Sequence, residues 1–162
     1  MKATKRILIA LAILFVVYGA YITGYTIGRV KPDITADAQP SFLQQINDIR
    51  TARGLPAMTE DNSLDATALI KANDMAAKNY FDHNAPDGTP WYDFIQKNRP
   101  GSERIGENLA ECFTDNTSTI AAWVKSEGHF KNMIGPDWTK FGTATVWDAD
   151  RSCYLTVNHF SK

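Results

Sequence analysis

The most constraining feature of this sequence is an uncharged run near its N-terminal end. The 22 residues from Ile7 to Gly28 contain no charged side chain. With a rise of about 1.5 Å per residue, a helix of this length spans the hydrocarbon core of a bilayer, which is about 30 Å thick. The run therefore predicts a transmembrane helix within residues 1–28.

A cleaved signal peptide is the alternative interpretation of the same run. Signal peptides carry shorter apolar segments, of about 7–15 residues, which end close to the cleavage site. The small residues of Ala36-Asp37-Ala38 fit such a site but lie well beyond Gly28. We therefore expect an uncleaved membrane anchor, and secretion after cleavage is the alternative.

Charge is distributed unevenly along the chain. Of its 162 residues, 17 are Lys or Arg and 18 are Asp or Glu, and the first acidic residue is Asp33. Lys2, Lys5 and Arg6 precede the apolar run, which favours a cytoplasmic N-terminus and an extracytoplasmic C-terminal part. No basic run of the kind that a phosphate backbone requires follows this segment, so we expect no nucleic-acid partner.

The remainder of the chain is long enough for one domain. Residues 29–40 include two prolines and no apolar periodicity, which predicts a linker, and the domain is expected at residues 41–162.

The pattern of apolar residues in this domain predicts helices first and a β-hairpin last. Helical spacing begins after Ser41 and stops at Gly54, and it recurs over residues 62–78, 91–97 and 116–125. We expect Gly128 to end or interrupt the last of these helices. Extended structure is predicted for residues 105–110, 141–147 and 153–160, with a polar turn between the last two. The fold class is therefore α+β.

Two cysteines, Cys112 and Cys153, lie in the part that the anchor would place outside the cytoplasm. Disulfides persist in such oxidising compartments. We expect a bond between them, because the closing strand must return toward the segment after Gly106. Two buried free thiols are the alternative.

Three polar residues at separate loop or helix-end positions, His83, Glu107 and His129, offer ligands that suit Zn²⁺ with an open position for water. Each also has an ordinary structural interpretation, since a histidine is often simply hydrogen-bonded and Glu107 can pair with Arg104. Neither G-x-S-x-G nor H-E-x-x-H is present, and Ser126 is expected to be a helix-end residue rather than a nucleophile.

Several short motifs follow one another along the chain. They are Phe81-Asp82-His83 with Pro86-Asp87-Gly88, Gly106-Glu107-Asn108-Leu109-Ala110, Trp123 with Ser126 and Gly128-His129, Asn132, Phe141-Gly142 and Asn158. In these motifs the chain resembles the CAP superfamily, or SCP domain, which contains the cysteine-rich secretory, antigen 5 and pathogenesis-related proteins. The resemblance covers roughly residues 41–160 and is greatest to short bacterial extracytoplasmic members.

This resemblance implies an α-β-α sandwich around a small antiparallel sheet, with a cleft lined by two histidines and acidic residues. The matching positions are His83, Glu107 and His129, with Glu127 as a further candidate, while His159 is not assigned to the site. The function implied is an extracytoplasmic binding module for a metal, lipid, glycan or protein ligand. The alternative is a metal-dependent hydrolase or protease acting on an envelope peptide or glycan. We expect weak Zn²⁺ binding by His83, Glu107 and His129.

Overall fold

The computed structural model describes residues 40–101 and 104–162. The predicted membrane segment and all of the predicted linker except Pro40 lie outside the described residues. Within the two described ranges, no helix has the length and apolar character needed to cross a bilayer.

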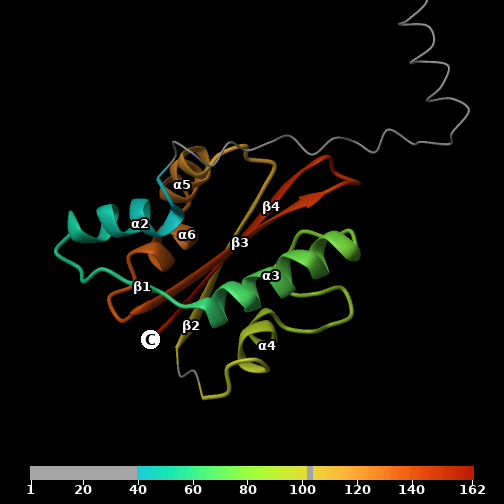
Figure 1. Cartoon of the computed structure of the whole chain (residues 1–162), viewed down its shortest axis with the longest axis horizontal. Helices are drawn as coiled ribbons and strands as arrows, with labels where there is room; N and C mark the ends of the chain where they lie inside the picture. Colours follow the sequence, from blue (N-terminus) through green and yellow to red (C-terminus); the bar gives the residue numbers. More distant parts are fainter. Residues whose placement is uncertain (1–39, 102–103) are drawn as a thin grey trace, which may run out of the picture. The chain divides into compact units, whose positions relative to one another are not determined.

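Helices cover both faces of one small sheet (Figure 1). In chain order the elements are α2 (Phe42–Thr51), β1 (Thr59–Glu60), α3 (Asn62–Ala77), α4 (Trp91–Gln96), β2 (Ile105–Glu111), α5 (Asn116–Lys125), α6 (Glu127–Met133), β3 (Lys140–Asp148) and β4 (Cys153–Ser161). The sheet order is β1-β3-β4-β2, antiparallel except for the short parallel pair β1 and β3. With α3 and α4 on one face and α2, α5 and α6 on the other, the predicted α-β-α arrangement is confirmed.

Polar side chains directly before α2 and α3 cap these two predicted helices. Ser41 Oγ accepts a hydrogen bond from Gln44 N at 3.1 Å before α2, and Asp61 Oδ1 accepts one from Ser63 N at 2.9 Å before α3. Each bond satisfies a backbone donor that has no partner within the helix. The two helices therefore begin where the sequence indicates.

α5 occupies the predicted range, but the residue that ends it differs from the prediction. α5 ends at Lys125, Ser126 is extended with φ −95° and ψ 117°, and α6 begins at once with Glu127. Gly128 lies inside the first turn of α6, so the predicted break at the glycine is wrong. The extended backbone of Ser126 ends the hydrogen-bond ladder of α5, whereas a first-turn residue needs no intrahelical acceptor for its N–H.

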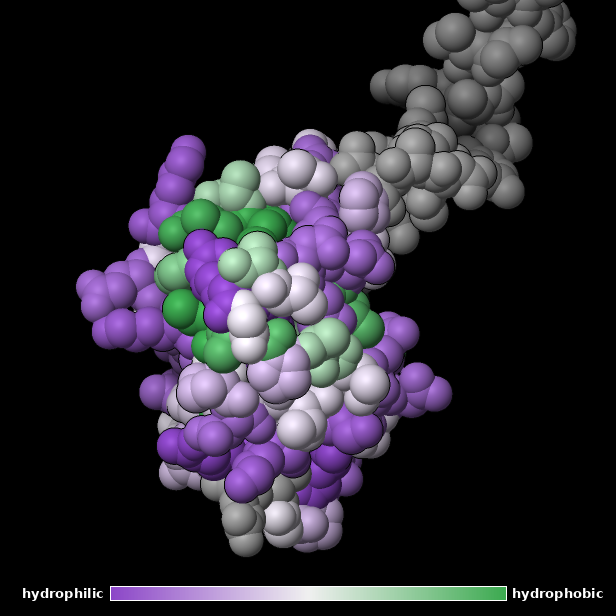
Figure 2. All heavy atoms as spheres, turned by 90° about the vertical axis from the view of Figure 1, so that its left-hand side faces the viewer, coloured by the Kyte–Doolittle hydropathy of each residue, from purple (hydrophilic) through white to green (hydrophobic). Residues whose placement is uncertain are grey.

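Side-chain alternation along the strands divides the core into two clusters. Leu155 and Val157 pack with α3, whereas Phe160 packs with the helices of the opposite face. On the side of the domain seen in Figure 2, hydrophobic residues that reach the surface gather in its upper half and hydrophilic residues cover most of the rest.

Arg50 is a buried cation that ties α2 to the loop between α6 and β3. Its side chain is fully buried. The guanidinium donates hydrogen bonds of 2.8 to 3.2 Å to the carbonyl oxygens of Pro56, Met133, Gly135 and Trp138. A planar fork of five N–H donors suits this task, because one side chain then satisfies several irregular carbonyl groups.

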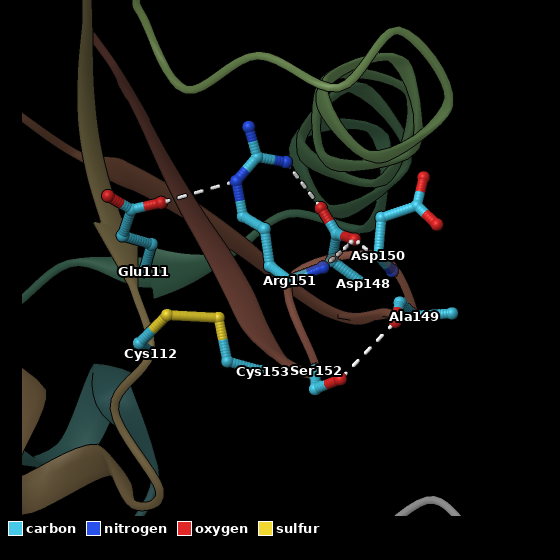
Figure 3. Close-up of a disulfide and its surroundings, with 8 residues drawn as sticks. All are labelled: Glu111, Cys112, Asp148, Ala149, Asp150, Arg151, Ser152 and Cys153. Carbon is cyan, nitrogen blue, oxygen red and sulfur yellow. Dashed lines mark hydrogen bonds and ion pairs between the residues drawn. A yellow bond between two sulfur atoms is a disulfide. The ribbon is translucent and has the colours of Figure 1, made fainter. Parts of the chain in front are cut away.

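The disulfide predicted between Cys112 and Cys153 is present (Figure 3). It joins the residue that follows β2 to the first residue of β4, 41 positions further along the chain. Beside it, Arg151 pairs with Asp148 in the turn of the hairpin and with Glu111 at the end of β2. Covalent and ionic links thus join the hairpin to β2 at the same end of the sheet.

Replacing both Cys112 and Cys153 by serine should lower the free energy of unfolding by about 3–4 kcal/mol, because the chain-entropy model assigns this to closing a loop of about forty residues. Urea unfolding of the full chain measures the change. The unmodified chain in reducing agent is the control and should unfold at the same urea concentration as the double variant. An unchanged midpoint in both samples would contradict the prediction.

Candidate functional site

The carboxylate of Glu107 lies at the centre of the candidate site. Glu107 is only 4% exposed within β2. Its Oε1 lies 2.7 Å from His83 Nδ1, and its Oε2 lies 3.0 Å from His159 Nε2. A buried carboxylate is costly unless donors surround it, and the two imidazoles supply one donor to each oxygen.

Strand register brings His159 to Glu107. The two residues are directly opposite each other in the antiparallel pair of β2 and β4, so their side chains share a face of the sheet. On that face, Thr67 Oγ1 of α3 lies 2.8 Å from His159 Nδ1. Thr67 Oγ1 also donates a hydrogen bond to the carbonyl oxygen of Leu64 at 2.9 Å, so this hydroxyl links His159 to the first turn of α3. His159 is fully buried and supports Glu107 from behind.

His159 is therefore a functional candidate that sequence reasoning missed. The available signal was alternation, since Leu155 and Val157 place position 159 on the same buried face. A histidine that continues an apolar face is a buried polar group in need of a partner. Only the register with β2 identifies that partner as Glu107.

The loop that carries His83 is held by a buried ammonium group. Lys71 of α3 is fully buried, and its Nζ donates to the carbonyl oxygens of Asp82 at 2.8 Å and His83 at 2.6 Å and to Tyr80 Oη at 3.0 Å. Burial lowers the pKa of Lys71, although the negative charge of Glu107 acts in the opposite direction. The position of His83 thus depends on a lysine that lies in the apolar stripe of α3.

Hydrogen bonding and burial shift the pKa values of the site in different directions. The bond to Glu107 raises the pKa of His83. Burial opposes ionisation of Glu107, but the bonds from His159 and His83 outweigh burial and lower its pKa. Burial lowers the pKa of His129, and the nearby charge of His83 lowers it further. His83 and Glu107 therefore favour an ion pair, whereas His129 favours the neutral form.

His83 and Glu107 line a cavity of about 480 Å³, here named the His83 cleft, together with Asp82, Asn84, Trp91, Ile105, Gly106 and Asn132. His129 lines a separate, mainly apolar cavity of about 290 Å³, here named the His129 pocket, with Trp123 among its walls. The ring centroids of His129 and Trp123 are 6.2 Å apart. The two predicted histidines thus line different cavities.

Glu127 does not join the other predicted site residues. Its side chain is 83% exposed and pairs with Lys131 one turn later on α6, at 2.6 Å. Ser126 forms the junction of α5 and α6, as expected of a helix-end residue. Arg104 pairs with Asp137 and not with Glu107.

Among residues 40–101 and 104–162, no three His, Cys, Asp or Glu side chains are grouped so that they could hold a metal ion. Glu107 engages both carboxylate oxygens with histidines, so it orients His83 rather than acting as a free ligand. The imidazoles of His83 and His129 are the ligand groups that remain. Zinc binding stays a prediction.

Residues 43–159 match the family model of the cysteine-rich secretory protein family, CAP. The match extends over most of the chain and contains Glu107 and all three histidines. The chain belongs to this family, and the resemblance found in its motifs is confirmed.

Relatives of the chain include two Bacillus subtilis (strain 168) proteins. The uncharacterized protein YkwD is 32% identical over 116 residues, which are 71% of this chain and 45% of YkwD. The uncharacterized membrane protein YlbC is 26% identical over 157 residues, 91% of this chain and 44% of YlbC. The chain therefore spans less than half the length of these curated relatives.

The fold is also similar to that of a solved bacterial structure. The crystal structure of an extracellular protein containing an SCP domain from Bacillus anthracis str. Ames has a TM-score of 0.67 to this chain at 28% sequence identity. The similarity covers 75% of this chain and 39% of that chain.

Replacing Glu107 by glutamine should return the pKa of His83 toward the ordinary value of 6.5, because a neutral amide replaces the carboxylate that accepts the raising hydrogen bond. In the unmodified chain, the stability contributed by charged His83 is fully present below that value and is lost as the pH rises through the raised pKa. The contribution of ionised Glu107 is lost as the pH falls through its lowered pKa.

NMR titration of the histidine ring protons, beside thermal unfolding across the same pH range, measures both effects. His129 is the internal control for global unfolding in the variant, since its ring packs against Trp123. If the pKa of His83 were the same in the Glu107→Gln chain and the unmodified chain, Glu107 would not be the cause of the raised pKa.

Replacing Lys71 by methionine should lower the free energy of unfolding by about 2 kcal/mol and broaden the NMR signals of His83, because the carbonyl oxygens of the loop lose a charged donor. Lys78→Met is the matched control, since Lys78 is 42% exposed and pairs with Asp74 and Asp87 at the surface. Chemical unfolding and NMR measure the two variants. Equal free energies of unfolding and equal His83 signals in the two variants would refute the role assigned to Lys71.

Proposed function

We propose that the chain is an extracytoplasmic binding module of the CAP family and that its ligand site is the His83 cleft. The observation that carries this proposal is that the position of His83 is fixed by hydrogen bonds. Glu107 binds the imidazole at Nδ1, and Lys71 binds the backbone carbonyl of His83. The Nε2 atom of His83 has no hydrogen-bond partner among the described residues. A rigidly held polar group at the wall of a cavity of this size is typical of a binding site.

The chemistry of the site favours binding over turnover. Nucleophilic catalysis needs an activated hydroxyl or thiol, and general base catalysis needs an available proton acceptor. The two cysteines form a disulfide, and no hydrogen bond joins Ser126 to His129 in the part of the chain that the structure describes. Glu107 already accepts from two imidazoles. The hydrolase or protease alternative therefore finds no specific support.

An extracytoplasmic location fits the disulfide, which persists in oxidising compartments. The relative from Bacillus anthracis is described as extracellular, and YlbC is named a membrane protein. We propose that residues 1–28 anchor the domain to the membrane, with release by cleavage as the alternative.

Zn²⁺ is the metal we propose for the site. A more distant structure of the same fold, NaASP2 with Zn²⁺, has a TM-score of 0.50 and 15% identity over 74% of this chain and 76% of that chain. The proposed ligand in the His83 cleft is the His83 imidazole, which Glu107 orients as carboxylates do behind many zinc-bound histidines. His129, which lines the separate His129 pocket, is the second proposed ligand. Since bound imidazole must be deprotonated, zinc affinity should fall as the pH drops through the pKa of His83, which the bond to Glu107 raises above its ordinary value.

The test uses the full chain in a zwitterionic detergent without sugar headgroups and three kinds of probe: Zn²⁺, soluble oligosaccharides and short peptides. We expect at least one probe to shift the NMR signals of His83, and mass spectrometry to recover that probe unchanged. His83→Ala should abolish the binding, whereas Glu127→Ala is the control and should leave it unchanged. Cleavage of a probe that a chelator abolishes would establish the hydrolase, and no shift with any probe would reject the binding module.

A further inference from the structure

A larger cavity adjoins the His83 cleft. It measures about 540 Å³ and is here named the Trp138 groove. Trp91 and Ile105 line both cavities, so the groove continues the cleft beyond these two side chains. The groove is rich in aromatic rings, with Tyr92 and Trp138 beside Trp91. An elongated ligand can therefore occupy both cavities at once.

Trp138 forms a rigid wall of the groove. Its Nε1 donates to the carbonyl oxygen of Asn132 at 2.7 Å, and its ring stacks on Phe160 with centroids 6.2 Å apart. A Cβ at Gly135 would collide with the indole, and a Cβ at Gly106 would lie 3.2 Å from it, so both glycines leave the space that the ring fills. The Trp138 indole is therefore already fixed before a ligand binds, which lowers the entropy cost of binding.

α4 contributes polar side-chain atoms to the groove that lack a partner in the described part of the chain. Trp91 and Tyr92 lie edge to face with centroids 6.0 Å apart, and Asn84 Oδ1 holds the backbone N–H of Trp91 at 3.0 Å. The indole N–H of Trp91, the hydroxyl of Tyr92 and the amide of Gln96 have no hydrogen-bond partner among the described residues. All three residues line the groove.

Charge in the groove is compensated internally. Arg104 and Asp137, which both line it, form an ion pair with each other. An anionic ligand would have to compete for the guanidinium, and an acyl chain would cover neutral polar groups without bonding them, which costs free energy. The groove is thus suited to an uncharged ligand with both apolar faces and hydroxyl groups.

We propose that the Trp138 groove and the His83 cleft together bind an oligosaccharide chain. Sugar rings present flat C–H faces, which pack on Trp91 and Trp138, and hydroxyl edges, which both donate and accept hydrogen bonds with Tyr92 and Gln96. His83 binds a hydroxyl or carbonyl group at the far end of the chain. This inference rests on the proposed function and adds the class of ligand to it.

A proline-rich peptide is the competing ligand, because such peptides also dock in grooves lined by aromatic residues. Their proline residues offer carbonyl acceptors but no backbone donors. The groove carries groups that accept as well as donate, namely the Tyr92 hydroxyl and the Gln96 amide. Hydroxyl groups match that set and a polyproline backbone does not.

The four tryptophans of the chain provide a test with internal controls. Trp91 and Trp138 line the groove, Trp123 lines the His129 pocket, and Trp147 packs on Tyr154 with centroids 5.0 Å apart, outside these three cavities. The probes are tetrasaccharides of N-acetylglucosamine, glucose and mannose and a polyproline peptide, added to the full chain in the same sugar-free detergent. We expect at least one tetrasaccharide to shift the indole N–H signals of Trp91 and Trp138 and leave that of Trp147 in place.

Substitutions in the groove then test which side chains contribute to saccharide affinity. Trp91→Ala and Tyr92→Ala should each weaken saccharide binding by about tenfold, as the loss of one aromatic contact implies. Tyr92→Phe keeps the ring and should weaken it less. Phe130→Ala is the matched control, because Phe130 is a partly exposed aromatic residue that packs under Arg53 and lines none of the three cavities. The unchanged Trp147 signal shows that each variant is folded.

The outcomes separate this inference from the proposed function. The oligosaccharide proposal would be overturned if only the peptide shifted the indole signals of Trp91 and Trp138. It would also be overturned if any probe shifted the signal of Trp123 alone. Zn²⁺ or peptide signals at His83 without any saccharide response would overturn it and leave the binding module intact. If no probe shifted the signals of His83 or of any tryptophan, both the oligosaccharide proposal and the binding module would be rejected.

Discussion

The burial of one carboxylate determines how the site is built. Glu107 lies in the sheet under α3, where an unpaired charge would be strongly destabilising, so both of its oxygens need donors. One donor, His159, comes from the neighbouring strand, and the other, His83, comes from a loop that is distant in sequence. The same pair of bonds therefore anchors the loop to the sheet and orients the histidine that lines the cleft.

Two further buried charges organise the irregular segments around this centre. Loops leave carbonyl groups without partners, and such groups must be satisfied when they are covered. Lys71 satisfies the loop that carries His83, and Arg50 satisfies the loop that carries Trp138. The cleft and the groove beside it are thus shaped by loops that are fixed from below by cations. This explains how a small domain can hold polar groups in place for a ligand.

Local interactions account for the parts of the structure that the sequence predicted well. Helical spacing and capping residues such as Ser41 depend on neighbours within a few positions, and the polar turn before Cys153 joins two strands that are adjacent in the chain. Motifs of the family indicated His83, Glu107 and His129 as candidate site residues. The break between α5 and α6 was assigned to Gly128 because glycine often ends a helix, whereas the extended backbone of Ser126 ends α5.

By itself, the sequence determined the α+β class, most element positions and the pairing of Cys112 with Cys153, and it indicated His83, Glu107 and His129 as candidate site residues. Only the tertiary structure decided that His159 supports Glu107, that Lys71 holds the loop and that Glu127 faces solvent with Lys131. The physical reason is range. Periodicity and caps are local, whereas a buried polar group acquires its role from strand register and from partners far away in the chain, which no short pattern encodes.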